Sequence, residues 1–341
     1  MKLLIAGSDK VYAIENFYVK YLREMGVEVY HFAAQSFFYD YYQKNIFNKL
    51  LFRAGLSGIL KKINDQFKNT VETFKPDIIW VFKGMELFPQ SLQWAKDKKI
   101  KLVNYNPDSP FVFSGKGSGN ANVANSICLY DLFLTYNSAD AKKMKTFHQV
   151  ASAILPFGFN ITDDLYNKCV QQKEIYRACF LGNPDTNRAQ FLQQLAEEGI
   201  QLDVYGNHWG KFLKHPNIRI YAPVYEDGFW QTLYRYRVQL NLMRLHNPDT
   251  HNMRSFEVPG VGGIQLAPAT TDHKTYFEEG KEIFLYSDIN NCRVQIKKIL
   301  AMTAEDAAAI RLQARQRSLA SHYTYKDRSA QALVHLNKLL E

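Results

Sequence analysis

The sequence of 341 residues has few cysteines and no long apolar run. Its four cysteines, Cys128, Cys169, Cys179 and Cys292, lie far apart, and no pair has the spacing of a metal site or a redox motif, so we expect buried thiols in a reducing cytosol. No segment approaches the ~20 apolar residues of a membrane span. The apolar start, Met1–Gly7, is too short for the core of a signal peptide and resembles a first strand. We therefore predict a cytoplasmic protein that does not cross the membrane.

Several motifs are also missing. Gly7-Ser8 lacks the other glycines of Gly-x-Gly-x-x-Gly, which argues against a dinucleotide-binding dehydrogenase. No Asp-x-Asp motif follows a predicted strand, and His246, Asp249 and His251 lack the spacing of a helical His pair, so we expect no essential metal. The net charge of +9 favours an anionic partner. Without a zinc-finger, RNP or KH signature, we expect a phosphorylated small molecule or a membrane surface and no nucleic acid.

Alternating strands and helices dominate the rest of the sequence. Apolar runs predict strands at residues 2–7, 27–32, 77–82, 101–105, 132–136 and 152–156, and then at 176–181, 202–205, 218–221, 238–242, 264–268 and 283–286. Helical patterns separate them, and two helices end the chain. This alternation predicts an α/β fold with parallel sheets. Because the chain is longer than one hydrophobic core usually serves, we expect two Rossmann-like domains, 1–165 and 175–324. A polar linker at 161–174 would join them, with the site in a cleft between them.

The segment 46–74 is helical, basic and amphipathic, with leucines and isoleucines beside five cationic residues. An ordinary helix with one solvated face explains this pattern. Peripheral contact with an anionic membrane explains it too. The sequence leaves both interpretations open.

The most informative stretch is residues 246–266, in which Arg254-Ser255-Phe256-Glu257 precedes the turn Gly260–Gly263. A helix that starts near Arg254 offers free N–H groups, and the guanidinium adds a bidentate donor, so the pair suits a diphosphate. Glu257, one turn later, can accept hydrogen bonds from both ribose hydroxyls. Glycines let a backbone approach a ligand closely, although Gly-Gly before a strand is also a plain turn.

This stretch resembles the donor site of group-1 glycosyltransferases, and most closely the CgeB-like (spore-maturation protein) branch, where Arg-x-Phe-Glu also precedes a glycine-rich turn. A Phe-x-x-Gly-x-Glu element follows at 277–282, and 322–328 resembles the family's terminal helix. The resemblance implies the GT-B fold, with the helix 325–341 packing back on the first domain. It also implies that Glu257 is the second of two acids eight positions apart, Asp249 standing where the first is usually glutamate.

The resemblance further implies the residues that bind a nucleoside diphosphate sugar. They are Gly182, Asn183, Arg188, Tyr205, Gly206, Asn252, Arg254, Phe256, Glu257, Gly262 and Gly263. In the first domain, Lys83 and Asp108 follow predicted strands, and Asp108 could act as a general base toward an acceptor hydroxyl or simply cap an Asn-Pro-Asp turn.

The implied function is transfer of the sugar to a glycan, lipid-linked or protein acceptor, with retention and without a metal or other cofactor. The alternatives are a sugar-nucleotide epimerase of the same fold and a non-catalytic binding protein. The protein would be cytoplasmic or attached peripherally to the inner face of the membrane.

Overall fold

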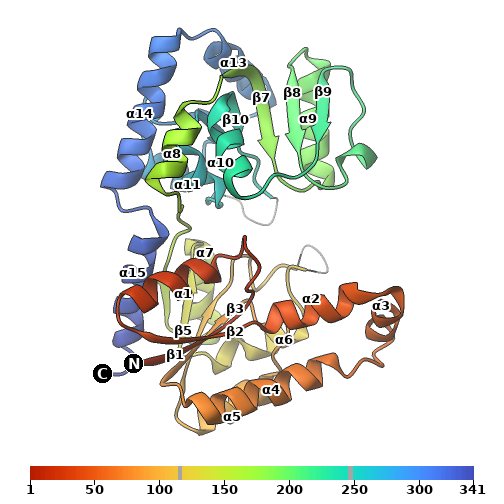
Figure 1. Cartoon of the computed structure of the whole chain (residues 1–341), viewed down its shortest axis with the longest axis vertical. Helices are drawn as coiled ribbons and strands as arrows, with labels where there is room; N and C mark the ends of the chain where they lie inside the picture. Colours follow the sequence, from red (N-terminus) through yellow and green to blue (C-terminus); the bar gives the residue numbers. More distant parts are fainter. Residues whose placement is uncertain (114–116, 245–248) are drawn as a thin grey trace. The chain divides into compact units, whose positions relative to one another are not determined.

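The computed structural model describes residues 1–113, 117–244 and 249–341 (Figure 1). The chain divides into two compact units. The first unit comprises Met1–Pro156 and Tyr325–Glu341, and the second comprises Phe157–Thr324. Each unit is built on one parallel sheet of six strands. Within the described residues, the helices are all too short or too polar to cross a bilayer.

The sheet of the first unit has the order β2-β1-β3-β4-β5-β6. Its strands are β1 (Lys2–Ala6), β2 (Glu28–Phe32), β3 (Ile78–Phe82), β4 (Lys101–Tyr105), β5 (Leu132–Thr135) and β6 (Ser152–Ile154). Its helices are α1 (Glu15–Glu24), α2 (Ala34–Lys44), α3 (Ile46–Arg53), α4 (Ile59–Phe74), α5 (Pro89–Asp97), α6 (Ala121–Ser126), α7 (Ser138–Lys143) and α15 (Tyr325–Asn337), with short turns at Ile127–Leu129 and Met144–His148.

Helices bury the sheet of the first unit on both faces, which explains its continuous apolar runs. Strand β3 is buried along its whole length. On one face, Ile63, Phe67 and Val71 of α4 belong to the apolar core. On the other, the Tyr325 ring of α15 stacks on Phe17 of α1, with 4.7 Å between ring centroids. The last helix of the chain therefore packs within the first unit.

The sheet of the second unit has the order β12-β11-β10-β7-β8-β9, which is the strand order of a Rossmann fold. Its strands are β7 (Ile175–Leu181), β8 (Leu202–Tyr205), β9 (Ile218–Tyr221), β10 (Tyr236–Leu240), β11 (Gln265–Pro268) and β12 (Phe284–Tyr286). Its helices are α8 (Asp163–Val170), α9 (Thr186–Glu197), α10 (Glu226–Arg235), α11 (Arg254–Gly260), α12 (Thr271–Tyr276), α13 (Ile289–Leu300) and α14 (Ala304–Ala320), with a 3-10 turn at Trp209–Lys211.

The structure corrects four expectations. The helix predicted over 46–74 is two helices, because the chain turns at Gly55, whose φ is +71°. The polar stretch 161–174 contains helix α8, where the Thr162 hydroxyl accepts the Leu165 N–H and two aspartates fill the first turn, so its polarity marks a helix start. Three helices follow β12 instead of two. Cys128 is exposed, whereas Cys169, Cys179 and Cys292 are buried as expected.

Helix α2 was missing from the expected elements. Its sequence, Ala34–Lys44, is rich in phenylalanine and tyrosine, which favour strands locally. Packing decides otherwise, because the Phe38 ring meets the Phe52 ring of α3 edge-on at 4.8 Å. Tertiary contacts therefore override the local preference of this segment.

Candidate functional site

Open parallel sheets bind ligands at the carboxyl ends of their strands, where the strand order reverses. In the second unit this switch point lies between β7 and β10, which pair directly. The segments that follow these strands, Gly182-Asn183 and Asn241–Arg244, therefore lie at this switch point. In the first unit the switch point lies between β1 and β3, followed by Gly7-Ser8 and Lys83-Gly84.

Arg188 spans the switch point of the second unit. Its Nη2 donates to the Leu242 carbonyl at 2.7 Å, and its Nη1 donates to the Asn183 carbonyl at 3.3 Å. The side chain starts in the first turn of α9, where Asp185 accepts the Arg188 N–H at 3.0 Å. Arg188 thus joins the ends of β10 and β7, while its buried Nε lies 3.5 Å from Asp185 Oδ2 and has no hydrogen-bond acceptor within the described structure.

Three guanidinium groups interact electrostatically at this switch point. Burial first, and then repulsion from Arg244 and Arg254, lower the pKa of Arg188 to about 10 against the pull of Asp185. Arg244 is exposed and forms no hydrogen bond or ion pair with the described residues. A cluster of arginines with spare donors suits an anion with several oxygens. Sequence reasoning missed Arg244, although a basic residue shortly after a predicted strand was a usable signal.

Arg254 and Glu257 form an ion pair on α11. The Arg254 guanidinium also lies over the Phe229 ring, 4.4 Å from its centroid. Burial raises the pKa of Glu257, and the charge and hydrogen bond of Arg254 oppose that rise. The buried Arg254 Nε has no partner in the described part of the chain. The ion pair therefore places a carboxylate and a guanidinium side by side near the switch point.

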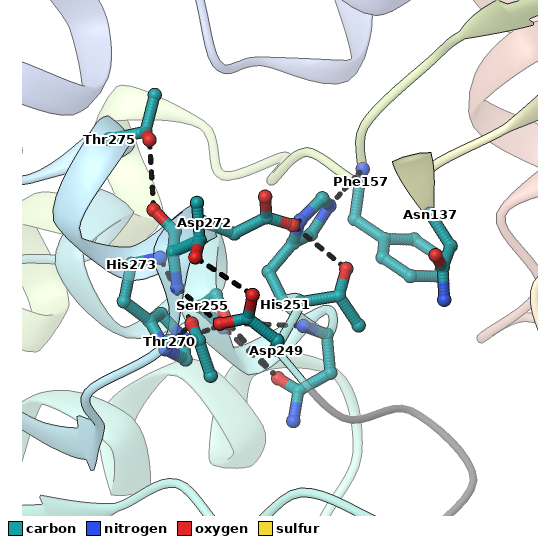
Figure 2. A network of polar contacts seen from close by, with 12 residues as sticks. Asn137, Phe157, Asp249, His251, Ser255, Thr270, Asp272, His273 and Thr275 are labelled. Carbon is teal, nitrogen blue, oxygen red and sulfur yellow. Dashed lines mark hydrogen bonds and ion pairs between the residues drawn. The ribbon is translucent and has the colours of Figure 1, made fainter. Parts of the chain in front are cut away.

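A buried network fixes the start of α11 (Figure 2). The His273 Nδ1–H donates to the Pro268 carbonyl at 2.8 Å, which leaves Nε2 to accept the Ser255 hydroxyl at 2.7 Å. The Ser255 oxygen accepts in turn from Asn241 Nδ2 and from the Asn252 N–H. Burial lowers the pKa of His273 to about 4, so the ring is neutral. These bonds lock the helix that carries Arg254 and Glu257.

Asn252 serves this network directly. Its Oδ1 accepts the Ser255 N–H at 3.2 Å, and its Nδ2 donates to Asn241 Oδ1 at 2.7 Å. The N–H of Glu257 donates to the Met253 carbonyl. Hydrogen bonds within the chain already use the N–H groups of Ser255, Phe256 and Glu257, which leaves the arginine side chains as the main charged donors.

The acids and histidines before α11 have structural partners. Asp249 accepts the Thr271 N–H at 2.7 Å and the Thr271 hydroxyl at 2.8 Å, so its carboxylate secures the start of α12. The His251 ring, fully buried, donates through Nδ1 to Asp272 at 2.6 Å and accepts the Phe157 N–H through Nε2 (Figure 2). His246 lies outside the described residues. In the described part of the chain, no cluster of three His, Cys, Asp or Glu is arranged for a metal.

The glycine turn after α11 does not face this site, which corrects our expectation. Helix α11 runs back from the carboxyl edge of the sheet, so the turn lies at the amino edge, just before β11. A Cβ at Gly263 would lie 2.6 Å from the Leu233 carbonyl oxygen, and Gly262 has φ +78° with the Arg311 carbonyl 3.2 Å from a Cβ. Gly262 and Gly263 therefore let backbone segments pack closely and do not contact a ligand at Arg254.

Other expected site residues support the fold. Phe256 is fully buried and meets the rings of His251, Tyr276 and Tyr323. Tyr205, also buried, bonds through its hydroxyl to the Tyr236 hydroxyl at 2.9 Å. Gly206 leaves room for the Gly182 carbonyl, which accepts the indole N–H of Trp209 at 2.8 Å. Gly182 and Asn183 themselves stay accessible at the end of β7.

In the first unit the structure brings Lys83 and Asp108 together, as an ion pair with 2.8 Å between Nζ and Oδ2. Lys83 follows β3 with φ +62°, and its Nζ also donates to the Gly117 carbonyl at 2.5 Å. The Asp108 N–H donates to Asn106 Oδ1 at 3.0 Å, which is the turn expected of Asn-Pro-Asp. Both side chains remain partly exposed.

Two buried carboxyl groups at this switch point were missed from sequence. Glu15 accepts the Ser8 N–H at 2.9 Å and lies against Gly7, and Glu86 follows Lys83 by three residues. Burial raises the pKa of each to about 7, while the Lys83 charge opposes the rise. A glutamate at the start of the first helix, shortly after the Gly-Ser turn, was the available signal for Glu15.

Because the pKa of Glu86 is raised, we predict that the free energy of unfolding depends on pH. The folded value of about 7 exceeds the ordinary 4.5, so unfolding releases a proton between these values and wild-type stability falls as pH rises through this window. We expect Glu86→Gln to stabilise the protein at pH 8 by up to about 3 kcal/mol and to have little effect near pH 4.5. Urea unfolding at both pH values measures this. Glu24→Gln, at an exposed site, is the control. Equal effects of Glu86→Gln on stability at both pH values would refute the prediction.

Comparison with known proteins supports the fold and matches part of the chain to a family model. The family model described as "Glycosyl transferase-like" matches residues 188–334, less than half of the chain. The match begins at Arg188 and includes Arg244, Arg254 and Glu257. A search of curated protein sequences gave no match. The predicted CgeB-like branch stays a prediction.

Solved structures resemble the whole chain at low identity. Sucrose-phosphate synthase from Thermosynechococcus elongatus has a TM-score of 0.71 and 12% identity, covering 100% of this chain and 99% of that one. Anabaena HepE in complex with UDP-glucose has a TM-score of 0.67 and 13% identity, covering 99% and 100%. A putative UDP-N-acetylglucosamine 2-epimerase from Listeria monocytogenes has a TM-score of 0.58 and 10% identity, covering 99% and 96%. These neighbours and the two parallel sheets confirm the predicted α/β fold of the GT-B type.

Proposed function

We propose that this protein is a glycosyltransferase that moves a sugar from a nucleoside diphosphate sugar, bound by the second unit, to an acceptor bound by the first. One observation carries the proposal. Arg188 bridges the strand ends at the switch point of a segment that matches a glycosyl transferase-like model, and it is repelled electrostatically by Arg244 and by Arg254, the partner of the Glu257 carboxylate. The positive cluster suits the diphosphate, and the carboxylate suits the two ribose hydroxyls.

The arginines would act on the leaving group. Negative charge develops on the diphosphate as the sugar departs, and fixed donors aimed at that charge lower the barrier more than they stabilise the bound donor. Ser255, His273 and Asn252 would not touch the substrate. They would hold α11 so that Arg254 and Glu257 need little rearrangement on binding.

The acceptor side rests on Lys83 and Asp108. Asp108 would accept the proton of the attacking hydroxyl, and Lys83 would orient that carboxylate through their 2.8 Å ion pair. We propose that the acceptor hydroxyl attacks from the face that the diphosphate leaves, so that transfer retains the anomeric configuration, and that transfer needs no metal, as the resemblance to group-1 enzymes implies. The acceptor class is a glycan, a lipid-linked sugar or a protein.

A panel of nucleotides tests the donor claim. We expect UDP, GDP or dTDP to raise the unfolding temperature, because a ligand at 100 times its Kd stabilises the fold by about 2.7 kcal/mol. CMP, which lacks the second phosphate, should have a smaller effect, and NAD should have almost none. If none of the diphosphates changed the melting curve, the proposal would lose its main support.

An epimerase is the second candidate, since the fold neighbours include a putative UDP-N-acetylglucosamine 2-epimerase. The two reactions differ in their need for an acceptor. Incubation with the sugar nucleotide that binds best, without any acceptor, should leave a transferase's donor configuration unchanged at the carbon that an epimerase inverts. NMR of the recovered sugar nucleotide distinguishes the two reactions.

A further inference from the structure

Helix α3 of the first unit carries an unusual surface. This helix connects α2 and α4 (Figure 1). All eight residues of α3 are at least partly exposed, among them Ile46 at 73%, Phe47 at 64% and Leu50 at 55%. Leu56, just after the helix, is 75% exposed. Single exposed apolar residues are ordinary, but four within eleven positions form a patch.

The patch is held in a fixed shape. Helical spacing puts Ile46 and Leu50 on the outer face, with Leu51 and Phe52 on the inner one. The Phe52 ring meets Phe38 at 4.8 Å and Tyr42 at 5.8 Å between centroids. The Asn45 side chain accepts the Asn48 N–H at 2.8 Å and caps the helix. The outward apolar residues are therefore not a consequence of a loosely packed helix.

Positive charge surrounds the apolar residues. Residues 44–62 contain five cationic side chains and no acidic one; the five are Lys44, Lys49, Arg53, Lys61 and Lys62, of which Lys61 pairs with Asp65 at 2.6 Å. Arg53 lies on the same helical face as Ile46 and Leu50, and Lys49 lies beside it. The apolar face of α4, in contrast, is buried in the core through Ile63, Phe67 and Val71. The structure thus separates the two helices that the sequence presented as one amphipathic segment.

We propose that the α3 patch, consisting of Ile46, Phe47, Leu50 and Leu56 with Lys49 and Arg53 on the same helix and Lys44 and Lys62 near it in sequence, docks the protein on an anionic lipid surface. Aliphatic and phenyl side chains enter the boundary between headgroups and acyl chains, while lysine and arginine contact anionic headgroups. A second copy of the chain would bring the same positive charge against itself. Nucleic acid would attract the charge but would leave the isoleucine and leucines without an apolar partner. This inference does not depend on the proposed reaction.

Sedimentation with vesicles tests the proposal. The full chain should bind vesicles of phosphatidylcholine and phosphatidylglycerol at least about tenfold more tightly than vesicles of phosphatidylcholine alone, and added salt should weaken the binding. Combining Ile46→Ser, Phe47→Ser and Leu50→Ser should weaken binding by about 100-fold. Lys49→Gln with Arg53→Gln should weaken it by at least about tenfold.

The chain offers a matched control for the apolar substitutions. Val294, Leu312 and Leu319 are 46–57% exposed on α13 and α14, and their replacement by serine should leave vesicle binding unchanged. Circular dichroism and the melting temperature check that each variant folds. Equal binding of the triple α3 variant and the wild type would overturn the proposal. Equal binding to neutral vesicles, preference for an RNA oligonucleotide, or a dimer that only the α3 substitutions dissolve would overturn it as well.

Discussion

Replacing Arg254 by alanine should weaken the binding of a nucleoside diphosphate by about 100-fold. A charged hydrogen bond contributes roughly 1.5–3 kcal/mol, and the arginine fork can give two of them to a diphosphate. The substitution also leaves Glu257 buried beside the ligand's negative charge. Isothermal titration calorimetry with the nucleotide that best stabilises the wild type measures the change. Arg254→Lys should give an intermediate affinity, since lysine keeps the charge and loses the fork.

Two further variants separate binding from folding. Glu257 alone would be a buried carboxylate without its cation, so Arg254→Ala should also lower stability. The double variant Arg254→Ala with Glu257→Gln removes that charge and should recover much of the stability without recovering affinity. Arg293→Ala, which breaks a surface pair with Glu198 in the same unit, should bind nucleotide normally. Wild-type affinity in Arg254→Ala would show that this arginine does not hold the ligand.

Replacing Glu174 by alanine should destabilise the second unit by about 3–5 kcal/mol. The Glu174 carboxylate accepts from Arg237 at 2.9 and 2.5 Å and from Arg311 at 2.8 Å. The Arg237 side chain is fully buried and that of Arg311 is 10% exposed. Removing their shared partner leaves buried charges uncompensated, the change that is most costly in a buried ion network. Urea unfolding followed by circular dichroism measures the loss.

The pH dependence of this loss follows from the same contacts. Burial alone would raise the pKa of Glu174, but hydrogen bonds from Arg237 and Arg311 hold it below its ordinary value of 4.5. The carboxylate therefore stabilises the fold above that value and loses this effect as pH falls below it. The difference between wild type and Glu174→Ala should shrink on acidification. Glu198→Ala, at a partly exposed ion pair, should cost at most about 1 kcal/mol, and a similar cost for Glu174→Ala would contradict the role of the network.

Much of the fold could be predicted because strands of buried parallel sheets are encoded locally. Twelve apolar runs predicted the twelve strands of the described residues, with boundaries that differ by at most two residues. Helix α2 was not predicted because its aromatic residues favour a strand unless α3 packs on them. Helix α8 was predicted as a linker because the capped start of a helix and a linker have similar amino-acid compositions.

The candidate site was predicted only where its members are neighbours in sequence. Arg254 and Glu257 are three positions apart, and their pairing on α11 follows from helical spacing. Arg188 interacts electrostatically with Arg244 and Arg254 because β7 and β10 are adjacent strands. Glu15 and Glu86 likewise join Lys83 through the pairing of β1 with β3. Strand order depends on contacts between distant segments, which single-sequence patterns do not contain.

The sequence by itself determined the alternation of strands and helices and the Arg254–Glu257 motif, since both depend on spacing over a few residues. Only the tertiary structure decided which edge of a sheet each residue occupies. Gly262 and Gly263 adjoin the motif in sequence, yet α11 carries them to the opposite edge, where they admit the Leu233 and Arg311 carbonyls. Tertiary packing also decided that α4 buries its apolar face while α3 leaves Ile46 and Phe47 exposed. Burial depends on the whole fold, because a side chain is covered only by what packs against it.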